Sequence, residues 1–218
     1  AEAKKELTFG YIYASSEDDW NAYDYDCFAD ACERMGVKVV SGDAGWTPDN
    51  QLNIIQDMHT RGVDGIYSYT MTPEGDVKAA DLCKELGIPI VFANSEPAAT
   101  IDPTSYVTTV CCSYHDYGYS VIKYLCENHP GSKVFYCAGN LGMGIIEEYL
   151  RGIDTALAEC NNVVEIVKMT ETNWMADSGL KATEDIIASG VEFDTVFANS
   201  EQIAMGVISA LENAGITE

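Results

Sequence analysis

The hexapeptide VFANSE occupies residues 91–96 and occurs again at residues 196–201, 196 − 91 = 105 positions later. In each copy a short apolar run gives way abruptly to Asn-Ser-Glu, as expected where a buried parallel strand emerges at its carboxyl end. Open α/β sheets hold their ligands in the crevice outside those ends. Two such ends in two halves of the chain therefore predict one small molecule held between two sheets.

Strand and helix patterns alternate on both sides of these two copies. Strands are expected at residues 7–13, 37–41, 64–68, 88–93, 106–111, 133–138, 163–170 and 195–198. Helices are expected at residues 20–35, 48–61, 73–86, 113–129, 145–159, 178–189 and 202–214. This βαβ repetition predicts an α/β fold of doubly wound parallel sheets covered by helices on both faces. The pattern starts afresh near residues 110–113, which predicts one lobe at residues 1–110 and a second at residues 111–218.

The chain carries 12 Lys and Arg residues against 35 Asp and Glu residues, so its formal net charge is −23. Such a charge repels phosphate backbones and anionic membrane surfaces, and we expect no nucleic-acid partner. No run approaches the roughly 20 apolar residues that span a bilayer. The first residues also lack the apolar segment of a signal peptide. The sequence leaves open whether a leader or a lipid anchor precedes it.

The eight cysteines show no Cys-x-x-Cys spacing and no histidine at ligand distance, so we predict no metal site and no cofactor. Most of them fit small buried side chains, while the adjacent Cys111 and Cys112 are expected not to bridge each other. No nucleophile or acid–base constellation can be assembled, which argues against an enzyme. The glycines at 139, 142 and 144 predict a tight turn and lack the order of a nucleotide-binding fingerprint.

Three segments together resemble the type 1 periplasmic solute-binding proteins, in particular the glucose/galactose- and ribose-binding branch. They are GVDGI at residues 62–66, LGIPIVFAN at residues 86–94 and the stretch from Trp174 to FANSEQIAMG at residues 197–206. The resemblance implies a two-lobed protein without catalytic activity that closes on a ligand. It also implies delivery of that ligand to the membrane permease of an ABC transporter outside the cytoplasm.

The resemblance also implies a set of ligand-binding residues. Asp18 and Trp20 match an acidic hydrogen-bonding residue and a stacking aromatic, Asn94 matches a sugar-contacting Asn, and Trp174 matches a second stacking aromatic. Ser200 stands where relatives carry a ligand-contacting Asn, and Glu201 beside it is a further candidate. Flat aromatic faces suit the C–H surfaces of a sugar ring, and carboxylate and amide groups suit its hydroxyls.

Two departures from the family pattern bear on the ligand. Tyr149 takes the place of a pocket Arg, and Met143 and Ile145 replace the His and Asp just before it. The chain also ends at Glu218, before the segment that completes the second lobe in relatives, so the resemblance implies an incomplete second lobe. Because Arg151 is the only arginine expected near the pocket, a neutral polyhydroxylated ligand or a cation is favoured over an anion.

Each candidate has a structural alternative. Trp20 and Trp174 suit a packed core, Asn94 and Ser200 suit turn-capping, and Tyr149 suits the core or the rim. At the level of function, the alternative to a transport protein is the ligand-sensing extracytoplasmic domain of a chemoreceptor or sensor kinase. A DNA-binding regulator is disfavoured by the charge and because no DNA-reading pair of helices precedes Leu7.

Overall fold

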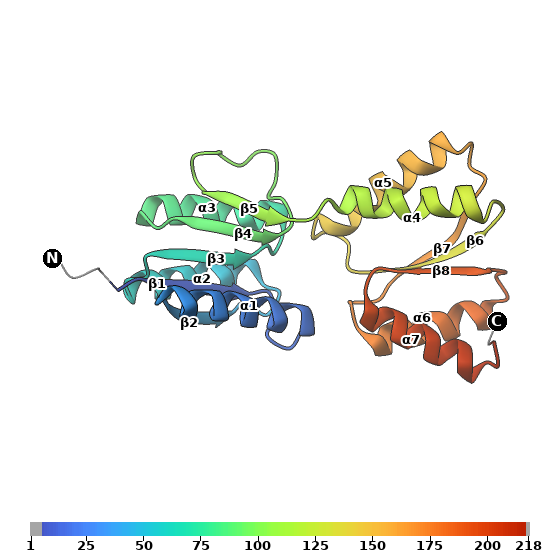
Figure 1. Cartoon of the computed structure of the whole chain (residues 1–218), viewed down its shortest axis with the longest axis horizontal. Coiled ribbons are helices and arrows are strands. Elements are labelled where there is room, and N and C mark those ends of the chain that lie inside the picture. The colour runs from blue at the N-terminus through green and yellow to red at the C-terminus, as the bar shows by residue number, and fades with distance from the viewer. Residues whose placement is uncertain (1–5, 217–218) are drawn as a thin grey trace. The chain divides into compact units, whose positions relative to one another are not determined.

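The computed structural model describes residues 6–216. The chain divides into two compact units, unit 1 ending at Cys112 and unit 2 beginning at Ser113. Strands and helices alternate through both units (Figure 1). The predicted α/β fold with parallel sheets is confirmed, and all the expected strands and helices are present, with ends no more than two residues from the expected ones. Within the described residues, no helix combines the length and the apolar character that a bilayer span requires.

Unit 1 contains a five-stranded sheet in the order β2-β1-β3-β4-β5, in which every neighbouring pair is parallel. Its strands are β1 (Thr8–Tyr13), β2 (Lys38–Asp43), β3 (Gly65–Tyr69), β4 (Ile90–Asn94) and β5 (Thr108–Cys111). Its helices are α1 (Asp19–Met35), α2 (Pro48–Thr60) and α3 (Pro73–Leu86). Because the strands are parallel, their carboxyl ends all lie at one edge of the sheet.

The ends of the helices in unit 1 follow the local sequence signals. The Thr72 side chain accepts a hydrogen bond from a backbone N–H in the first turn of α3, and Pro73 takes the first helical position. α1 and α3 end at Gly36 and Gly87, whose φ values of 69° and 70° are left-handed. Thr47 occupies the cap position of α2 but its side chain makes no capping hydrogen bond, and its hydroxyl donates to the Gly45 carbonyl.

The core of unit 1 lies between the central strands and the helices. Ile66 of β3 and Ile90 and Phe92 of β4 are fully or almost fully buried, and they belong to one cluster with Ile55 of α2 and Cys83 of α3. Buried apolar area of this kind is the main favourable contribution to folding. The core therefore fixes the backbone from which the strand ends project.

Unit 2 contains a three-stranded parallel sheet in the order β7-β6-β8. Its strands are β6 (Lys133–Ala138), β7 (Glu165–Glu171) and β8 (Thr195–Ala198). Its helices are α4 (Tyr114–Asn128), α5 (Ile145–Glu159), α6 (Ala176–Ser189) and α7 (Glu201–Asn213). The pair α4 and α5 covers one face of this sheet and the pair α6 and α7 covers the other (Figure 1).

Glycines allow the paired helices of unit 2 to touch backbone to backbone. A Cβ atom added at Gly206 of α7 would lie 1.9 Å from the carbonyl oxygen of Ala176 at the start of α6. A Cβ atom added at Gly152 of α5 would lie 2.0 Å from the carbonyl oxygen of His115 in α4. Since backbone atoms cannot move aside as a side chain can, both positions require glycine.

We therefore expect Gly206→Ala to lower the free energy of unfolding by about 1–3 kcal/mol, although alanine has the better helix propensity. Urea denaturation followed by circular dichroism measures this change. Gly65→Ala is the matched control, because the added methyl group would meet its nearest atoms at an ordinary 3.6 Å. Equal stability of Gly206→Ala and the wild type would contradict the backbone contact between α6 and α7.

Candidate functional site

At the carboxyl end of β1 in unit 1, Asp18 and Asn21 hold the start of α1. The Asp18 carboxylate accepts hydrogen bonds from the backbone and side-chain nitrogens of Asn21, at 2.9 Å and 2.7 Å. The Asn21 side-chain oxygen accepts in turn from the backbone N–H of Ala14. Trp20 lies in the first turn of α1 and is 62% exposed. The first turn of α1 thus presents an aromatic face to solvent beside a fixed carboxylate.

Asp43, at the end of β2, is a strand-end residue that sequence reasoning missed. Its carboxylate accepts hydrogen bonds from the backbone N–H groups of Ser16 and Gly45, at 2.9 Å and 2.8 Å, and from the Ser16 hydroxyl. Burial opposes the charged form of Asp43, but these donors outweigh it and lower the pKa. Asp43 therefore ties the loop after β1 to the loop after β2.

Asn94 ends β4 with a φ of 80°, in the left-handed region that few non-glycine residues adopt. The next residue, Ser95, is buried, and its hydroxyl lies 2.7 Å from the hydroxyl of Thr70 after β3. The residues predicted for unit 1, which are Asp18, Trp20 and Asn94, thus all lie at the carboxyl edge of one sheet.

In unit 2, Trp174 lies directly over Gly139, the residue that follows β6. A Cβ atom added at Gly139 would be 2.0 Å from the indole ring, so this contact requires glycine. Trp174 has a φ of 63° and is partly buried, and its ring borders both apolar clusters of unit 2. Its packing thus holds the indole at the carboxyl edge of the sheet, where one side of the ring is covered by Gly139.

Asn199, at the end of β8, joins two strands of unit 2 and was missed by sequence reasoning. Its side-chain oxygen accepts hydrogen bonds from the Tyr136 hydroxyl at 2.9 Å and from the Gly139 backbone N–H at 3.1 Å. The side chain therefore positions the glycine on which Trp174 rests. The repeated hexapeptide contains the signal that points to it, because Asn199 occupies the same place in the second copy as Asn94 in the first.

The carboxyl edge of unit 2 also holds buried polar atoms without hydrogen-bond partners. In the part of the chain that the structure describes, three such atoms lie here: the Asn140 side-chain oxygen, Oε2 of Glu147 and the Asn199 side-chain nitrogen. The other oxygen of Glu147 accepts from the Gly142 backbone N–H at 2.6 Å. Unpaired buried polar atoms are costly and uncommon in folded proteins. Two acceptors and one donor at one sheet edge match the mixed hydrogen-bonding capacity of a hydroxylated molecule.

The remaining residues predicted for unit 2 lie at the start of α7 and in α5. The Ser200 hydroxyl accepts from the Ile203 backbone N–H at 3.3 Å and caps α7, in agreement with its capping alternative. Glu201 is exposed in the first turn of the same helix. Tyr149 is only 7% exposed, and its ring packs near those of Tyr114 and Phe197, in agreement with its core alternative.

Basic residues are absent from every loop that follows a strand. The loops are residues 14–18, 44–47, 70–72, 95–107, 112–113, 139–144, 172–175 and 199–200, and none contains Lys or Arg. Arg151 is exposed on α5 and pairs with Glu148 at 2.6 Å. Among residues 6–216, no group of three His, Cys, Asp or Glu side chains is placed to hold a metal ion. These loops are poorly suited to bind an anion.

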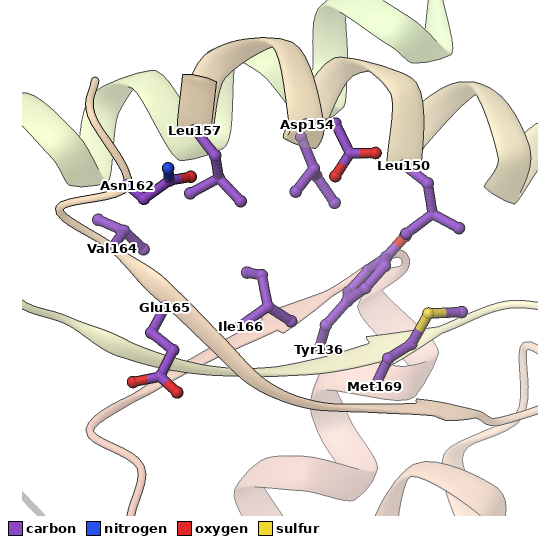
Figure 2. Close-up of a pocket in the computed structure, with 10 residues that line it drawn as sticks. Tyr136, Leu150, Asp154, Leu157, Asn162, Val164, Glu165, Ile166 and Met169 are labelled. Atoms are coloured by element: carbon purple, nitrogen blue, oxygen red, sulfur yellow. The ribbon is translucent and has the colours of Figure 1, made fainter. Parts of the chain in front are cut away.

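A cavity of about 460 Å³ lies on the flank of unit 2, between α5 and β7 (Figure 2). Its walls combine the apolar Leu150, Ile153 and Ile166 with the polar Tyr136, Asp154, Asn162 and Glu165. None of the lining residues contributes a buried polar atom without a hydrogen-bond partner, in contrast to the carboxyl edge of unit 2. The strand-end residues at the opposite, carboxyl end are therefore the stronger candidate site.

Comparison with known proteins places the chain among relatives of two kinds. A protein of Rhizobium meliloti, provisionally named a rhizopine-binding protein, is 28% identical over 83% of this chain and 59% of its own length. The HTH-type transcriptional repressor PurR of Vibrio cholerae is 24% identical over 96% of this chain and 60% of its own length. The chain thus spans about 60% of the length of these curated relatives.

A solved structure of a galactofuranose binding protein shares the fold, with a TM-score of 0.89 at 21% sequence identity. The match covers 97% of this chain and 72% of that protein. The family model described as a periplasmic binding protein domain matches residues 9–218, which is nearly the whole chain. The chain therefore belongs to the type 1 periplasmic binding protein family.

Proposed function

We propose that this chain binds a neutral polyhydroxylated small molecule, such as a sugar or a cyclic polyol, outside the cytoplasm. In this proposal it serves as the solute-binding component of an ABC transporter. We assign the contacts with the ligand to residues at the strand ends. Asp18, Trp20 and Asn94 act from unit 1, while Trp174 acts from unit 2 together with the polar groups of Asn140, Glu147 and Asn199.

The observation that carries the proposal is the carboxyl edge of unit 2, where an indole ring and three unpaired buried polar atoms occur together. An aromatic ring offers a flat apolar surface to the C–H groups of a sugar. The unpaired acceptors and donor offer hydrogen bonds to its hydroxyl groups. The absence of Lys and Arg from the strand-exit loops favours an uncharged ligand over a phosphorylated one.

Titration calorimetry with D-galactose, L-arabinose and myo-inositol tests the class of ligand, with glucose 6-phosphate as the anionic comparison. We expect saturable binding of at least one neutral compound at one site per chain and no binding of the sugar phosphate. Trp20 and Trp174 should report the same event as a change in tryptophan fluorescence. Binding of the phosphate ester alone would contradict the proposal.

The relatives that are transcriptional repressors favour a second candidate, a ligand-sensing part of a larger regulatory protein. A chemoreceptor or sensor kinase belongs to the same class, because in each the ligand changes a contact between proteins. The two candidates share the ligand site and differ in the partner. Ligand-dependent stimulation of a reconstituted permease supports transport, whereas no stimulation by ligand-bound protein contradicts it.

A further inference from the structure

The helices α4 and α5 of unit 2 are held together at their carboxyl-terminal halves by Glu159, the last residue of α5. The Tyr119 hydroxyl donates to its carboxylate at 2.8 Å, and the Lys123 ammonium lies 3.5 Å from the same oxygen. Tyr119 and Lys123 are one turn apart on α4, so both face α5. These contacts fix how the two helices meet near residues 126 and 160.

Cys126 and Cys160 meet at this place. Cys126 follows Lys123 by three residues on α4, and Cys160 follows Glu159 directly. Cys126 also follows Tyr119 by seven residues, so it faces α5 as Tyr119 and Lys123 do, and its thiol interacts with that of Cys160. Cys126 belongs to the apolar cluster under α4 and α5, and Cys160 packs against that cluster. Two thiols from adjacent helices are thus held near each other by their surroundings.

We propose that Cys126 and Cys160 form a disulfide bond in an oxidising compartment and so join the end of α4 to the end of α5. Disulfides form where two thiols approach closely on backbones that already lie side by side. They persist in proteins outside the cytoplasm, and this chain belongs to a family described as periplasmic. The bond is a covalent modification of unit 2 and does not depend on the identity of the ligand.

The surroundings also indicate which thiol reacts first. Cys160 is half-buried whereas Cys126 is buried, so Cys160 is the more accessible thiol. Burial, followed by the hydrogen bond with Cys160, raises the pKa of Cys126 to about 11. Cys160 is therefore the attacking thiolate and Cys126 the resolving thiol.

The oxidant is a disulfide donor, either a small-molecule disulfide or a thiol–disulfide oxidoreductase. The Cys160 thiolate attacks one donor sulfur, the donor S–S bond breaks, and one donor thiolate leaves and takes up a proton. Cys126 then loses its proton to solvent, and its sulfur attacks the Cys160 sulfur and displaces the second donor thiol. In total, two protein thiols lose two electrons and the donor disulfide is reduced to two thiols.

The test uses the whole chain with the exposed Cys111 and Cys112 replaced by serine, so that they cannot form bonds between molecules. The protein is equilibrated with oxidised glutathione, free thiols are alkylated, and unreduced peptides are mapped by mass spectrometry. We expect a peptide linked through Cys126 and Cys160. We also expect Tm to rise by about 5–10 °C on oxidation, because the bond closes a loop of 160 − 126 = 34 residues.

Two variants separate this bond from other effects of oxidation. Cys160→Ser should abolish both the linked peptide and the rise in Tm. Cys83→Ser, at a buried thiol of unit 1, should keep both. Alkylation of both Cys126 and Cys160 after oxidation of the parent protein would overturn the proposal without relying on any variant. A rise in Tm that persists in Cys160→Ser would overturn it as well.

Discussion

Trp174→Ala is expected to weaken the binding of the neutral ligand at least tenfold. The indole lies over Gly139 at the carboxyl edge of unit 2, so its removal takes away the flat apolar surface of the proposed site. Loss of a stacked aromatic removes about 0.5–1.5 kcal/mol beyond the burial of its area, and a tenfold change in affinity corresponds to about 1.4 kcal/mol. Titration calorimetry with the neutral compound that binds the wild type measures this change.

Trp174 also borders both apolar clusters of unit 2, so its loss affects stability as well as binding. Trp174→Phe keeps an aromatic ring and should retain more affinity than Trp174→Ala. Tyr124→Ala is the matched control, because it removes an exposed aromatic from α4 in the same unit. Folding of each variant is checked by circular dichroism before titration. Wild-type affinity in a folded Trp174→Ala protein would rule out stacking on this residue.

Asp76→Asn is expected to remove a large part of the pH dependence of stability. Asp76 lies in the first turn of α3 and is 0% exposed, and burial raises its pKa to about 7. Hydrogen bonds from the Met71 backbone N–H and the Gln51 amide oppose that shift but do not cancel it. Among the described residues, Oδ2 of Asp76 and the side-chain oxygen of Gln51 have no hydrogen-bond partner. Protonation removes the buried negative charge that these hydrogen bonds do not fully stabilise.

The sign of the effect follows from comparing the two states. The folded protein holds the proton up to about pH 7, whereas an aspartate in the unfolded chain releases it near the ordinary pKa of 3.8. Between these values the folded state binds more protons, so the free energy of unfolding falls as the pH rises. About three pKa units correspond to a loss on the order of 4 kcal/mol between pH 4 and pH 7.

Urea denaturation at several pH values measures this loss for the wild type and for Asp76→Asn. The variant should lose this contribution and be more stable than the wild type at pH 8, because it carries no buried charge there. Asp81→Asn, at an exposed position on the same helix, should leave the pH dependence unchanged. The same slope in Asp76→Asn and the wild type would show that the Asp76 carboxyl group does not titrate as described.

The sequence was sufficient to predict the succession of strands and helices because its signals are local. Proline after a Thr cap begins α3, and glycine in a left-handed conformation ends α1 and α3. Burial of β3 and β4 on both faces explains their continuous apolar runs. Thr47 shows the limit of such signals, because it precedes Pro48 as Thr72 precedes Pro73 and yet makes no capping hydrogen bond.

The candidate site was harder to predict because its residues depend on contacts distant in the chain. Asn199 is fixed by groups on β6 some sixty residues earlier, and the family resemblance pointed to its neighbour Ser200 instead. Gly139 was interpreted as part of a tight turn, although the overlying Trp174 ring is what requires a glycine there. Acidic residues are common in the first turn of a helix, so the sequence gives no signal that the Asp76 side chain is buried.

The central claim is that the carboxyl edge of unit 2 binds the ligand through Trp174 and the polar groups beside it, and the double variant Trp174→Ala/Asn140→Ala tests it most directly. Its affinity for the neutral ligand is measured by titration calorimetry beside that of each single variant. If the indole and the Asn140 side chain contact the same molecule, the double variant should lose more affinity than either single variant. An affinity no lower than that of Trp174→Ala alone would contradict a site formed by these two residues.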